Sequence, residues 1–560
     1  MRKYNIKIIY FVCIVLLTGF IIGCQGFPSF DAPKEAYEID PPVWTEWVAE
    51  NEYAGYTNLH ALFSDRTKFT TIAVPLDYAN PSSGTLDVAV LKVEAKNPSE
   101  RWGSILFNPG GPGGDGLTYG LLFNYLWSEE NPNAASGSGK LFLELTEHYD
   151  LIGFSPRGLG ASTKLVCSSD TNLVPELMLS ADGSETNLAA NMQNAQAIAE
   201  ACLANPLTQY INTEATARDM DIIRQVLGDE KLNFLGISYG TWLGTWYASL
   251  FPDRIGKMLL IGETDITRPL NEALLLQEMG MQRVLEKMLV PYAASNPHIF
   301  HLGNTEPEIM DAISSLQGEL KHVTIKTLDE HISYQENAHL ALFTLRAALM
   351  IDNLLAQKQA PDIESLNQLL DKVDWDVHPE YQELLSGIAR ILAQEYFNLV
   401  NQKPEPVNLV DSEAVWWAIQ CMDTNTAYDA DSWALQSSLH SEYYPQFGGF
   451  YVNNPSLFWS KAPVNRPPIE SIPSDASILI VQSEYDPYTP LEGAVRTFSA
   501  LPQASMIVLK GDYQHCIIVP YGNDELDRSV AEFFLYQKQP PRLSTVEGNP
   551  LPRFPETPTQ

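Results

Sequence analysis

Short apolar runs alternate with helical patterns along most of the chain. The runs that predict strands are bounded by turn-forming residues and cover 69–74, 86–93, 104–107, 149–154, 232–235, 257–261, 477–481 and 505–509. Between them, apolar residues recur at the spacing of three and four that is typical of helices, as in 217–227. Strands that alternate with helices predict an α/β fold with a mostly parallel sheet covered by helices on both faces.

The pattern changes in the middle of the chain. Long amphipathic helices are predicted there without a convincing strand between them, over 272–290, 306–320, 338–356 and 380–400. They predict a helical cap inserted into the α/β core. Alternation then resumes with a helix that starts at Thr489 as N-cap and Pro490 as first residue.

These patterns divide the chain into six segments. They are a leader (1–24), an irregular segment (25–60), the first part of the α/β core (61–269), the helical cap (270–410), the second part of the core (411–540) and a tail (541–560). The tail is rich in proline, and we expect it to be disordered.

The leader has the features of an export signal. Arg2, Lys3 and Lys7 precede an almost entirely apolar run, Ile8–Gly23, which is short for a membrane span. The run ends at Cys24 in a sequence that resembles a bacterial lipobox. We expect cleavage before Cys24 and its lipidation, which would be the chain's only attachment to a membrane; ordinary secretion is the alternative.

The cysteines fit an oxidising compartment. Cys167, Cys202, Cys421 and Cys516 remain after the leader and Cys24 are set aside. We expect a disulfide between Cys167 and Cys202, with Cys421 and Cys516 as the remaining pair. No His or Cys cluster has the spacing of a metal site, so no metal or other cofactor is expected.

The charge balance limits the partners. The chain carries 69 acidic and 35 basic residues, a formal net charge of -34. A polyanion such as nucleic acid would be repelled, and no cluster of basic residues offsets that repulsion.

One five-residue turn carries the strongest chemical indication. Gly236-Ile237-Ser238-Tyr239-Gly240 matches G-x-S-x-G, with a predicted strand before it and a predicted helix after it. This context is that of a nucleophile elbow, in which the strained turn exposes the serine hydroxyl above the sheet. Ser238 is therefore the candidate nucleophile.

A serine nucleophile needs a base and an acid, which follow it in this chain order. His515 follows the last core strand and is the candidate base. Asp486 follows the preceding strand and is the candidate acid, with Glu484 and Asp512 as competitors. Such a carboxylate would fix the imidazole tautomer and stabilise the imidazolium.

An oxyanion hole needs two backbone N–H groups. Tyr239, which follows the nucleophile, is one candidate, and Gly111 in the glycine-rich loop after 104–107 is the other. The loop also matches G-x-G-x-x-G through Gly111, Gly113 and Gly116. A dinucleotide site is disfavoured because it would need an acidic residue about 20 positions farther on, at the end of a second strand, and the chain has none there.

With these elements placed, the chain resembles the tripeptidyl aminopeptidase and prolyl aminopeptidase group of α/β-hydrolase serine peptidases. The resemblance runs from about Val74 to Phe534 and is carried by 74–78, 108–113, 150–158, 217–221, 235–241, 251–254, 418–423 and 486–490. It implies a triad of Ser238, Asp486 and His515, a helical cap that restricts access, and cleavage of short peptides from a free N-terminus.

The chain departs from the group's pattern in three places. The base lies in Tyr513-Gln514-His515-Cys516 rather than in a Gly-His-Gly-like stretch, and no Cys precedes Trp459. After the strand at 257–261 the usual Asp-Gly is replaced by Gly262-Glu263-Thr264-Asp265. Glu263 and Asp265 could bind a substrate ammonium, because a carboxylate best offsets the cost of removing that ammonium from water. Alternatively, one of the two caps a helix and the other is solvated.

The leading hypothesis is therefore an exported aminopeptidase acting on peptides. An esterase with the same triad is the alternative within enzymes, and a catalytically inactive surface protein is the alternative outside them. The number of residues released and the oligomeric state are left open by the sequence.

Overall fold

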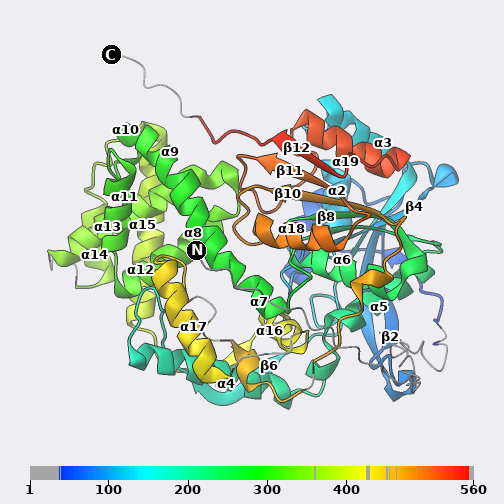
Figure 1. The fold of residues 1–560 in the computed structure, drawn as a ribbon, viewed down its shortest axis with the longest axis horizontal. Helices are drawn as coiled ribbons and strands as arrows, with labels where there is room; N and C mark the ends of the chain where they lie inside the picture. Colours follow the sequence, from blue (N-terminus) through cyan, green and yellow to red (C-terminus); the bar gives the residue numbers. More distant parts are fainter. Residues whose placement is uncertain are drawn as a thin grey trace, which may run out of the picture.

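A ten-stranded sheet forms the centre of the molecule in the computed structural model (Figure 1). The structure describes residues 37–553 except 38, 136, 358–360, 424–428, 450–451, 453 and 462, so the predicted leader and Cys24 lie outside it. In sheet order the strands are β1 (Thr45–Glu46), β2 (Thr67–Pro75), β3 (Thr85–Val93), β5 (Tyr149–Phe154), β4 (Gly103–Asn108), β7 (Leu232–Ile237), β8 (Ile255–Ile261), β10 (Ser477–Ser483), β11 (Ser505–Lys510) and β12 (Leu543–Glu547). From β5 to β12 every neighbouring pair is parallel, as the sequence predicts.

The central strands are buried on both faces. On β7, for example, Phe234 belongs to one apolar cluster and Leu235 to another on the opposite face. The first face is covered by α5 (Thr213–Val226), α6 (Tyr239–Leu250) and α18 (Leu491–Ala500). The second is covered by α2 (Tyr119–Leu126), α3 (Lys140–His148) and α19 (Asp524–Tyr536). This two-sided cover explains why the strand sequences are nearly continuous apolar runs.

The cap is a separate group of helices with its own apolar core, at the left of Figure 1. It comprises α8 (Leu276–Val284), α9 (Val290–Ser295), α10 (Pro297–Phe300), α11 (Glu306–Ser315), α12 (Gly318–Ile332), α13 (Ala338–Ala356), α14 (Ile363–Leu370) and α15 (Pro379–Val400). The short helix α7 (Leu270–Leu274) leads into the cap, and its Leu270 and Leu274 pack in the apolar cluster on the first face of the sheet. The segment Gln335–Ala356 is apolar and long enough to cross a membrane, but it packs in the cap core, as a core helix does.

Further elements connect the cap to the sheet domain. β6 (Cys167–Leu173) and β9 (Glu405–Leu409) form an antiparallel pair that the sequence analysis did not predict. Helix α4 (Glu185–Ala204) follows β6 in the chain, and helices α16 (Asp411–Met422) and α17 (Ala430–Tyr443) follow β9. Met178 and Phe447, which lie outside the predicted cap, belong to its apolar core. The cap is therefore assembled from more than one segment of the chain.

Four local predictions need correction. The helix predicted over 306–320 is broken, because Gly318 has a φ of +57° and starts a new helix. The segment predicted to be irregular contains β1 and a short helix, α1 (Thr57–Ala61). Pro490, not Thr489, is the N-cap of α18. The tail predicted to be disordered contains β12, which pairs with β11.

Candidate active site

Ser238 lies in a sharp turn between β7 and α6. Its φ of 57° and ψ of -124° are strained for a residue with a side chain. The turn is held by two backbone hydrogen bonds of 2.8 Å, from Ser238 N to Ile261 O and from Thr241 N to Ser238 O. Only glycine fits at Gly240, where a Cβ atom would lie 2.7 Å from Asn108 O. The pentapeptide therefore folds as the elbow that the sequence predicts.

His515 and Asp486 form a buried pair at the ends of neighbouring strands. His515 Nδ1 lies 2.9 Å from Asp486 Oδ1 and 3.0 Å from Oδ2. Asp486 Oδ1 also accepts hydrogen bonds from the amides of Tyr488 (2.9 Å) and Thr489 (2.8 Å), which fix the carboxylate. Because a carboxylate accepts at Nδ1, that nitrogen carries the proton and Nε2 is left as the base.

The competing acids have other partners. Glu484 accepts a hydrogen bond from the amide of Gly511 at 2.8 Å. Asp512 accepts from the amide of Gln514 at 2.8 Å and from the hydroxyl of Tyr521 at 3.0 Å. Of the three candidates, Asp486 is the carboxylate that the structure places against His515.

The strand end of β8 brings the histidine beside the elbow. Ser238 N is bonded to Ile261 O, and the next residue, Gly262, lies directly against the His515 ring. A Cβ atom on Gly262 would lie 3.3 Å from both Cε1 and Nδ1 of that ring. Ser238 thus contacts the last residue of β8, and His515 contacts the residue that follows it.

The glycine loop after β4 packs against the elbow from the other side. Gly110 and Gly111 have φ values of +93° and +105°, which favour glycine. A Cβ atom on Gly110 would lie 3.0 Å from Tyr239 N and 3.1 Å from Ser238 Cβ. The Tyr239 amide begins α6 and has no acceptor within the helix. The loop that carries Gly111 and the amide of Tyr239, the two predicted oxyanion donors, therefore both lie beside the serine.

A small pocket joins these parts to the cap. Its lining includes Ser238, Gly111, Tyr239 and Glu263, together with side chains of α7 such as Leu274. Glu263 is completely buried, and burial followed by the nearby charge of Asp265 raises its pKa well above the ordinary value.

The second predicted amine anchor has partners already. Asp265 is paired with Arg496 Nε at 2.7 Å and with Arg268 at 3.5 Å, and accepts from the hydroxyl of Thr267 at 2.5 Å. Of the two predicted anchors, only Glu263 is left without a counter-charge.

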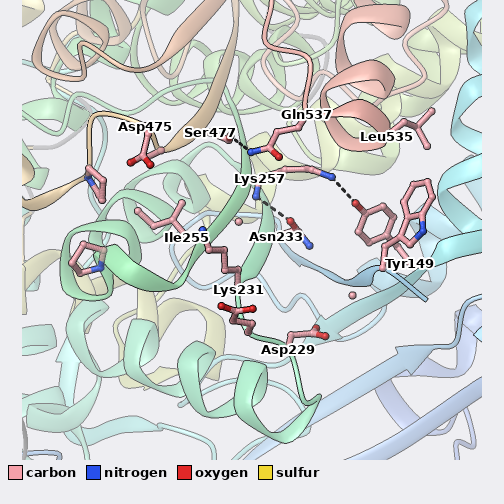
Figure 2. A pocket seen from close by; sticks show the side chains of 17 residues that line it. Tyr149, Asp229, Lys231, Asn233, Ile255, Lys257, Asp475, Ser477, Leu535 and Gln537 are labelled. Atoms are coloured by element: carbon pink, nitrogen blue, oxygen red, sulfur yellow. Dashed lines mark hydrogen bonds between the residues drawn. The ribbon is translucent and has the colours of Figure 1, made fainter. Parts of the chain in front are cut away.

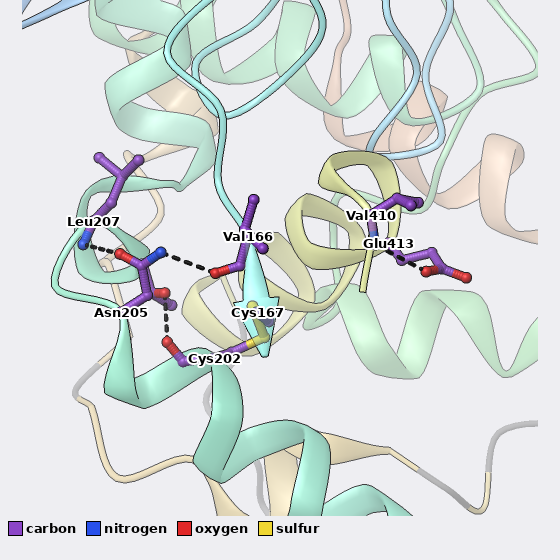
Figure 3. The surroundings of a disulfide bond; sticks show 8 residues. Val166, Cys167, Cys202, Asn205, Leu207, Val410 and Glu413 are labelled. Atoms are coloured by element: carbon purple, nitrogen blue, oxygen red, sulfur yellow. Dashed lines mark hydrogen bonds between the residues drawn. A yellow bond between two sulfur atoms is a disulfide. The ribbon is translucent and has the colours of Figure 1, made fainter. Parts of the chain in front are cut away.

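A disulfide links Cys167 on β6 to Cys202 on α4 (Figure 3). Next to it, Asn205 Nδ2 donates to Val166 O at 2.9 Å. The predicted pairing of Cys421 with Cys516 is wrong, since both are free thiols. Cys421 lies on α16, which packs on one face of the sheet, whereas Cys516 packs against the apolar cluster of the other face.

A larger cavity lies at the opposite end of the sheet (Figure 2). It has a volume of about 480 Å³ and is lined by residues at the amino ends of β7, β8 and β10, among them Asn233, Lys257 and Ser477. Lys257 Nζ donates to Tyr149 Oη at 2.8 Å there. Ligands of open α/β sheets bind at the carboxyl ends of the strands, where Ser238, Asp486 and His515 lie.

Some residues that hold the site were missed by the sequence analysis. The hydrogen bonds from the amides of Tyr488 and Thr489 follow the spacing of an Asx turn after Asp486, which was a usable indication. Tyr53 Oη donates a hydrogen bond of 2.5 Å to Asp115 Oδ2, which links the N-terminal segment to the glycine loop. Tyr53 lies 62 residues before Asp115, and no local pattern predicts that contact.

Taken together, the sheet order, the elbow and the His515–Asp486 pair define a serine hydrolase with the α/β-hydrolase fold. The family of the α/β hydrolase fold matches residues 103–295, and that of the TAP-like proteins matches 444–545.

Three curated relatives are similar over most of their length. The chain is 28% identical over 472 residues to a tripeptidyl aminopeptidase of Streptomyces lividans, covering 81% of this chain and 80% of the relative. It is 26% identical over 495 residues to serine protease Hip1 of Mycobacterium tuberculosis, covering 84% and 85%. It is 27% identical over 489 residues to carboxylesterase B of Mycobacterium tuberculosis, covering 84% of each. These likenesses confirm the resemblance to α/β-hydrolase serine peptidases.

Proposed function

We propose that the protein is an exported serine peptidase that cleaves peptides from a free N-terminus through an acyl-enzyme on Ser238. The observation that carries the proposal is the buried His515–Asp486 pair beside the strained elbow. A relative named as a tripeptidyl aminopeptidase supports the choice of substrate. A catalytically inactive binding protein would have no need of a buried carboxylate–imidazole pair beside a strained serine.

The proposed chemistry is acyl transfer to a serine and hydrolysis of the resulting ester. Ser238 Oγ attacks the scissile carbonyl while His515 Nε2 accepts its proton, and Asp486 stabilises the imidazolium. The N–H groups of Gly111 and Tyr239 stabilise the negative oxygen of the tetrahedral intermediate. His515 then gives the proton to the leaving amine, and a water molecule, activated by the same imidazole, hydrolyses the acyl-enzyme. No cofactor takes part in these steps.

Export is part of the proposal. The basic and apolar pattern of residues 1–24 supports it, as does the disulfide between Cys167 and Cys202, because disulfides persist in oxidising compartments. A lipid on Cys24 would anchor the enzyme to the cell envelope. Labelling with radioactive palmitate, lost in Cys24→Ala, tests the anchor.

An esterase is the second candidate, because one relative is named carboxylesterase B and the same triad hydrolyses esters. The test compares peptide anilides with free and acetylated N-termini and a short-chain ester. The proposal expects cleavage of the free peptides and at least a 100-fold loss on acetylation. Equal cleavage of the acetylated peptides, or hydrolysis of the ester alone, would overturn it.

A fluorophosphonate probe tests the nucleophile itself. Labelling of the folded protein that disappears in Ser238→Ala is expected. Ser238→Ala should also remove nearly all turnover, leaving the residual rate over water that binding and the oxyanion hole provide. A folded wild-type protein that is not labelled would favour an inactive binding protein.

A further inference from the structure

The two loops that carry the acid and the base of the triad both bind one short stretch of the cap. This stretch consists of the last turn of α12 and the three residues after it, 329–335, and we call it the α12 end. Tyr488 lies 159 residues after its partner Asp329 in the chain. The contact therefore joins the cap to the core across most of the cap sequence.

Tyr488 binds the acid loop to the α12 end. Its hydroxyl donates to Asp329, with Oδ1 at 2.6 Å and the backbone O at 2.7 Å. Its amide donates to Asp486 Oδ1 at 2.9 Å, and its ring centroid lies 5.1 Å from that of His515. One residue thus contacts the acid, the base and the cap at the same time.

The histidine loop binds the same stretch through three successive residues. The amide of His515 donates to Ser333 O at 3.0 Å. Gln335 N donates to Gln514 Oε1 at 2.9 Å, and Gln335 Oε1 accepts from the amide of Tyr513 at 3.2 Å. The base is therefore held by the cap on its own backbone and on that of its neighbours.

The end of a helix is suited to hold the two loops together. The last carbonyl groups of a helix have no partner within it. Asp329 O and Ser333 O lie at the end of α12, and they accept hydrogen bonds from the acid loop and from the histidine loop respectively. Because both bonds end on one turn of the same helix, they fix the acid relative to the base.

A second cap helix packs on the acid loop. Gly280 of α8 lies directly against Pro487 O, so closely that a Cβ atom at this position would overlap the oxygen. Pro487 lies between Asp486 and Tyr488 in the chain. The acid loop is thus held from the cap both by α8 and by the α12 end.

We propose that Tyr488 is a positioning residue that orders Asp486 and His515 by binding them to the cap through Asp329. The cap then contributes to the chemistry besides restricting access. Without this bond the acid and the base can move relative to one another, and proton transfer depends on their orientation. The inference rests on the triad of the proposed function but not on the choice of peptides as substrates.

The first experiment removes the bond to the cap alone. Tyr488→Phe keeps the ring beside His515 and the amide on Asp486. The kcat for a free peptide anilide and for p-nitrophenyl acetate should both fall roughly tenfold, with KM within about twofold. Titration with a fluorophosphonate probe counts the active sites, so that kcat refers to folded enzyme. Unchanged kcat, or a change confined to KM, would overturn the inference.

Two further single variants show whether the hydroxyl bond is responsible. Asp329→Asn is the conservative variant, because its amide oxygen can still accept from Tyr488, and it should keep kcat within about twofold. Tyr485→Phe is the matched control: it removes a hydroxyl from the same loop, at a residue that also packs on the cap core. It should retain both activities. A loss in either variant as large as that in Tyr488→Phe would overturn the inference.

A double variant separates positioning from folding. Tyr488→Phe leaves Asp329 without its donor, where burial raises the pKa of the carboxyl, so the melting temperature should fall. Combining it with Asp329→Leu removes both polar groups. The melting temperature should then return toward that of the wild type, while kcat stays low. Recovery of kcat together with the melting temperature would show a structural role alone and overturn the inference.

The ester substrate keeps this test independent of the peptidase assignment. Absence of peptide cleavage by the wild type, with ester hydrolysis retained, would overturn the proposed function. The comparison of Tyr488→Phe with the wild type on p-nitrophenyl acetate would still decide whether Tyr488 positions the triad.

Discussion

The Nδ1 atom of His515 lies 2.9 Å and 3.0 Å from the two carboxylate oxygens of Asp486, so the ring faces both of them. The carboxylate is in turn held by the amides of Tyr488 and Thr489. The imidazole is thereby fixed both in orientation and in tautomer, with Nε2 free for the serine. This arrangement determines what substitution of the acid should do.

Asp486→Asn should reduce kcat by about 10⁴-fold with little effect on folding. The amide can still accept from the two backbone N–H groups, but it can also donate to His515 Nδ1 and so favour the wrong tautomer. Initial rates with a peptide anilide, together with the melting temperature, check the prediction.

Glu484→Gln is the control for the acid, because Glu484 also follows β10 but bonds to the amide of Gly511. It should retain activity within a few-fold. A larger loss of kcat in Glu484→Gln than in Asp486→Asn would show that the acid has been assigned to the wrong residue.

The sequence could predict those parts of the site that depend on local order. The strand–turn–helix context of Ser238 identifies the elbow. Asp486 and His515 are found because they follow the last two strands that the sequence predicts, which correspond to β10 and β11. The parallel sheet follows from apolar runs that are buried on both faces, as Phe234 and Leu235 show.

Contacts between distant segments could not be predicted in this way. The bond from Tyr53 to Asp115 and that from the amide of His515 to Ser333 O, 3.0 Å long, depend on how the N-terminal segment and the cap pack against the core. β12 was not predicted because this short strand lies in a proline-rich part of the sequence. Its formation depends on pairing with β11, which the local sequence does not show. Cys421 and Cys516 are free thiols because they lie on opposite faces of the sheet, and the number of cysteines does not predict that separation.

Gly110→Ala should impair catalysis by disturbing the oxyanion hole. A Cβ atom there would meet Ile237 O and lie 3.0 Å from Tyr239 N, so the loop must move away from the elbow. We expect a loss of about 100- to 1000-fold in kcat, the size of one lost oxyanion donor. The measurement is kcat with a peptide anilide.

Gly228→Ala separates this close approach from backbone strain. Gly228 also has a positive φ, +74°, but nothing lies within 4 Å of the position of its Cβ atom. It should lower stability through strain alone and leave kcat nearly unchanged. Similar losses of kcat in the two variants would contradict a specific role for the Gly110 loop.

The disulfide between Cys167 and Cys202 should stabilise the fold by restricting the unfolded chain. The two cysteines are 35 residues apart, and closing a loop of that length contributes about 4 kcal/mol in the chain-entropy estimate. Cys202→Ser should therefore lower the free energy of unfolding by roughly 2–4 kcal/mol, measured by urea denaturation. Reductant should have a similar effect on the wild type and none on Cys202→Ser; a wild type indifferent to reductant in urea would contradict the prediction.

Asp423 should make stability fall as the pH rises toward neutrality. It is buried at the end of α16, where it accepts from Thr213 N at 3.1 Å and Trp242 Nε1 at 3.1 Å. Burial, only partly offset by these bonds, raises its pKa to about 7. The unfolded chain releases this proton near pH 4, whereas the folded chain keeps it until about pH 7. The folded state thus binds more protons over that interval, and its stability decreases through it.

Asp423→Asn removes this proton linkage. Its single amide oxygen replaces only one of the two acceptor oxygens, so we expect the variant to be less stable at every pH but to lack the pH dependence that Asp423 causes. Relative to the variant, the wild type should lose on the order of 4 kcal/mol of unfolding free energy between about pH 4 and pH 7. Urea denaturation at several pH values measures the difference. Asp431→Asn, which replaces an exposed carboxylate on α17, should follow the wild-type curve. If wild type and Asp423→Asn give parallel curves, Asp423 does not hold its proton in the folded state, and its bonds to Thr213 and Trp242 outweigh its burial.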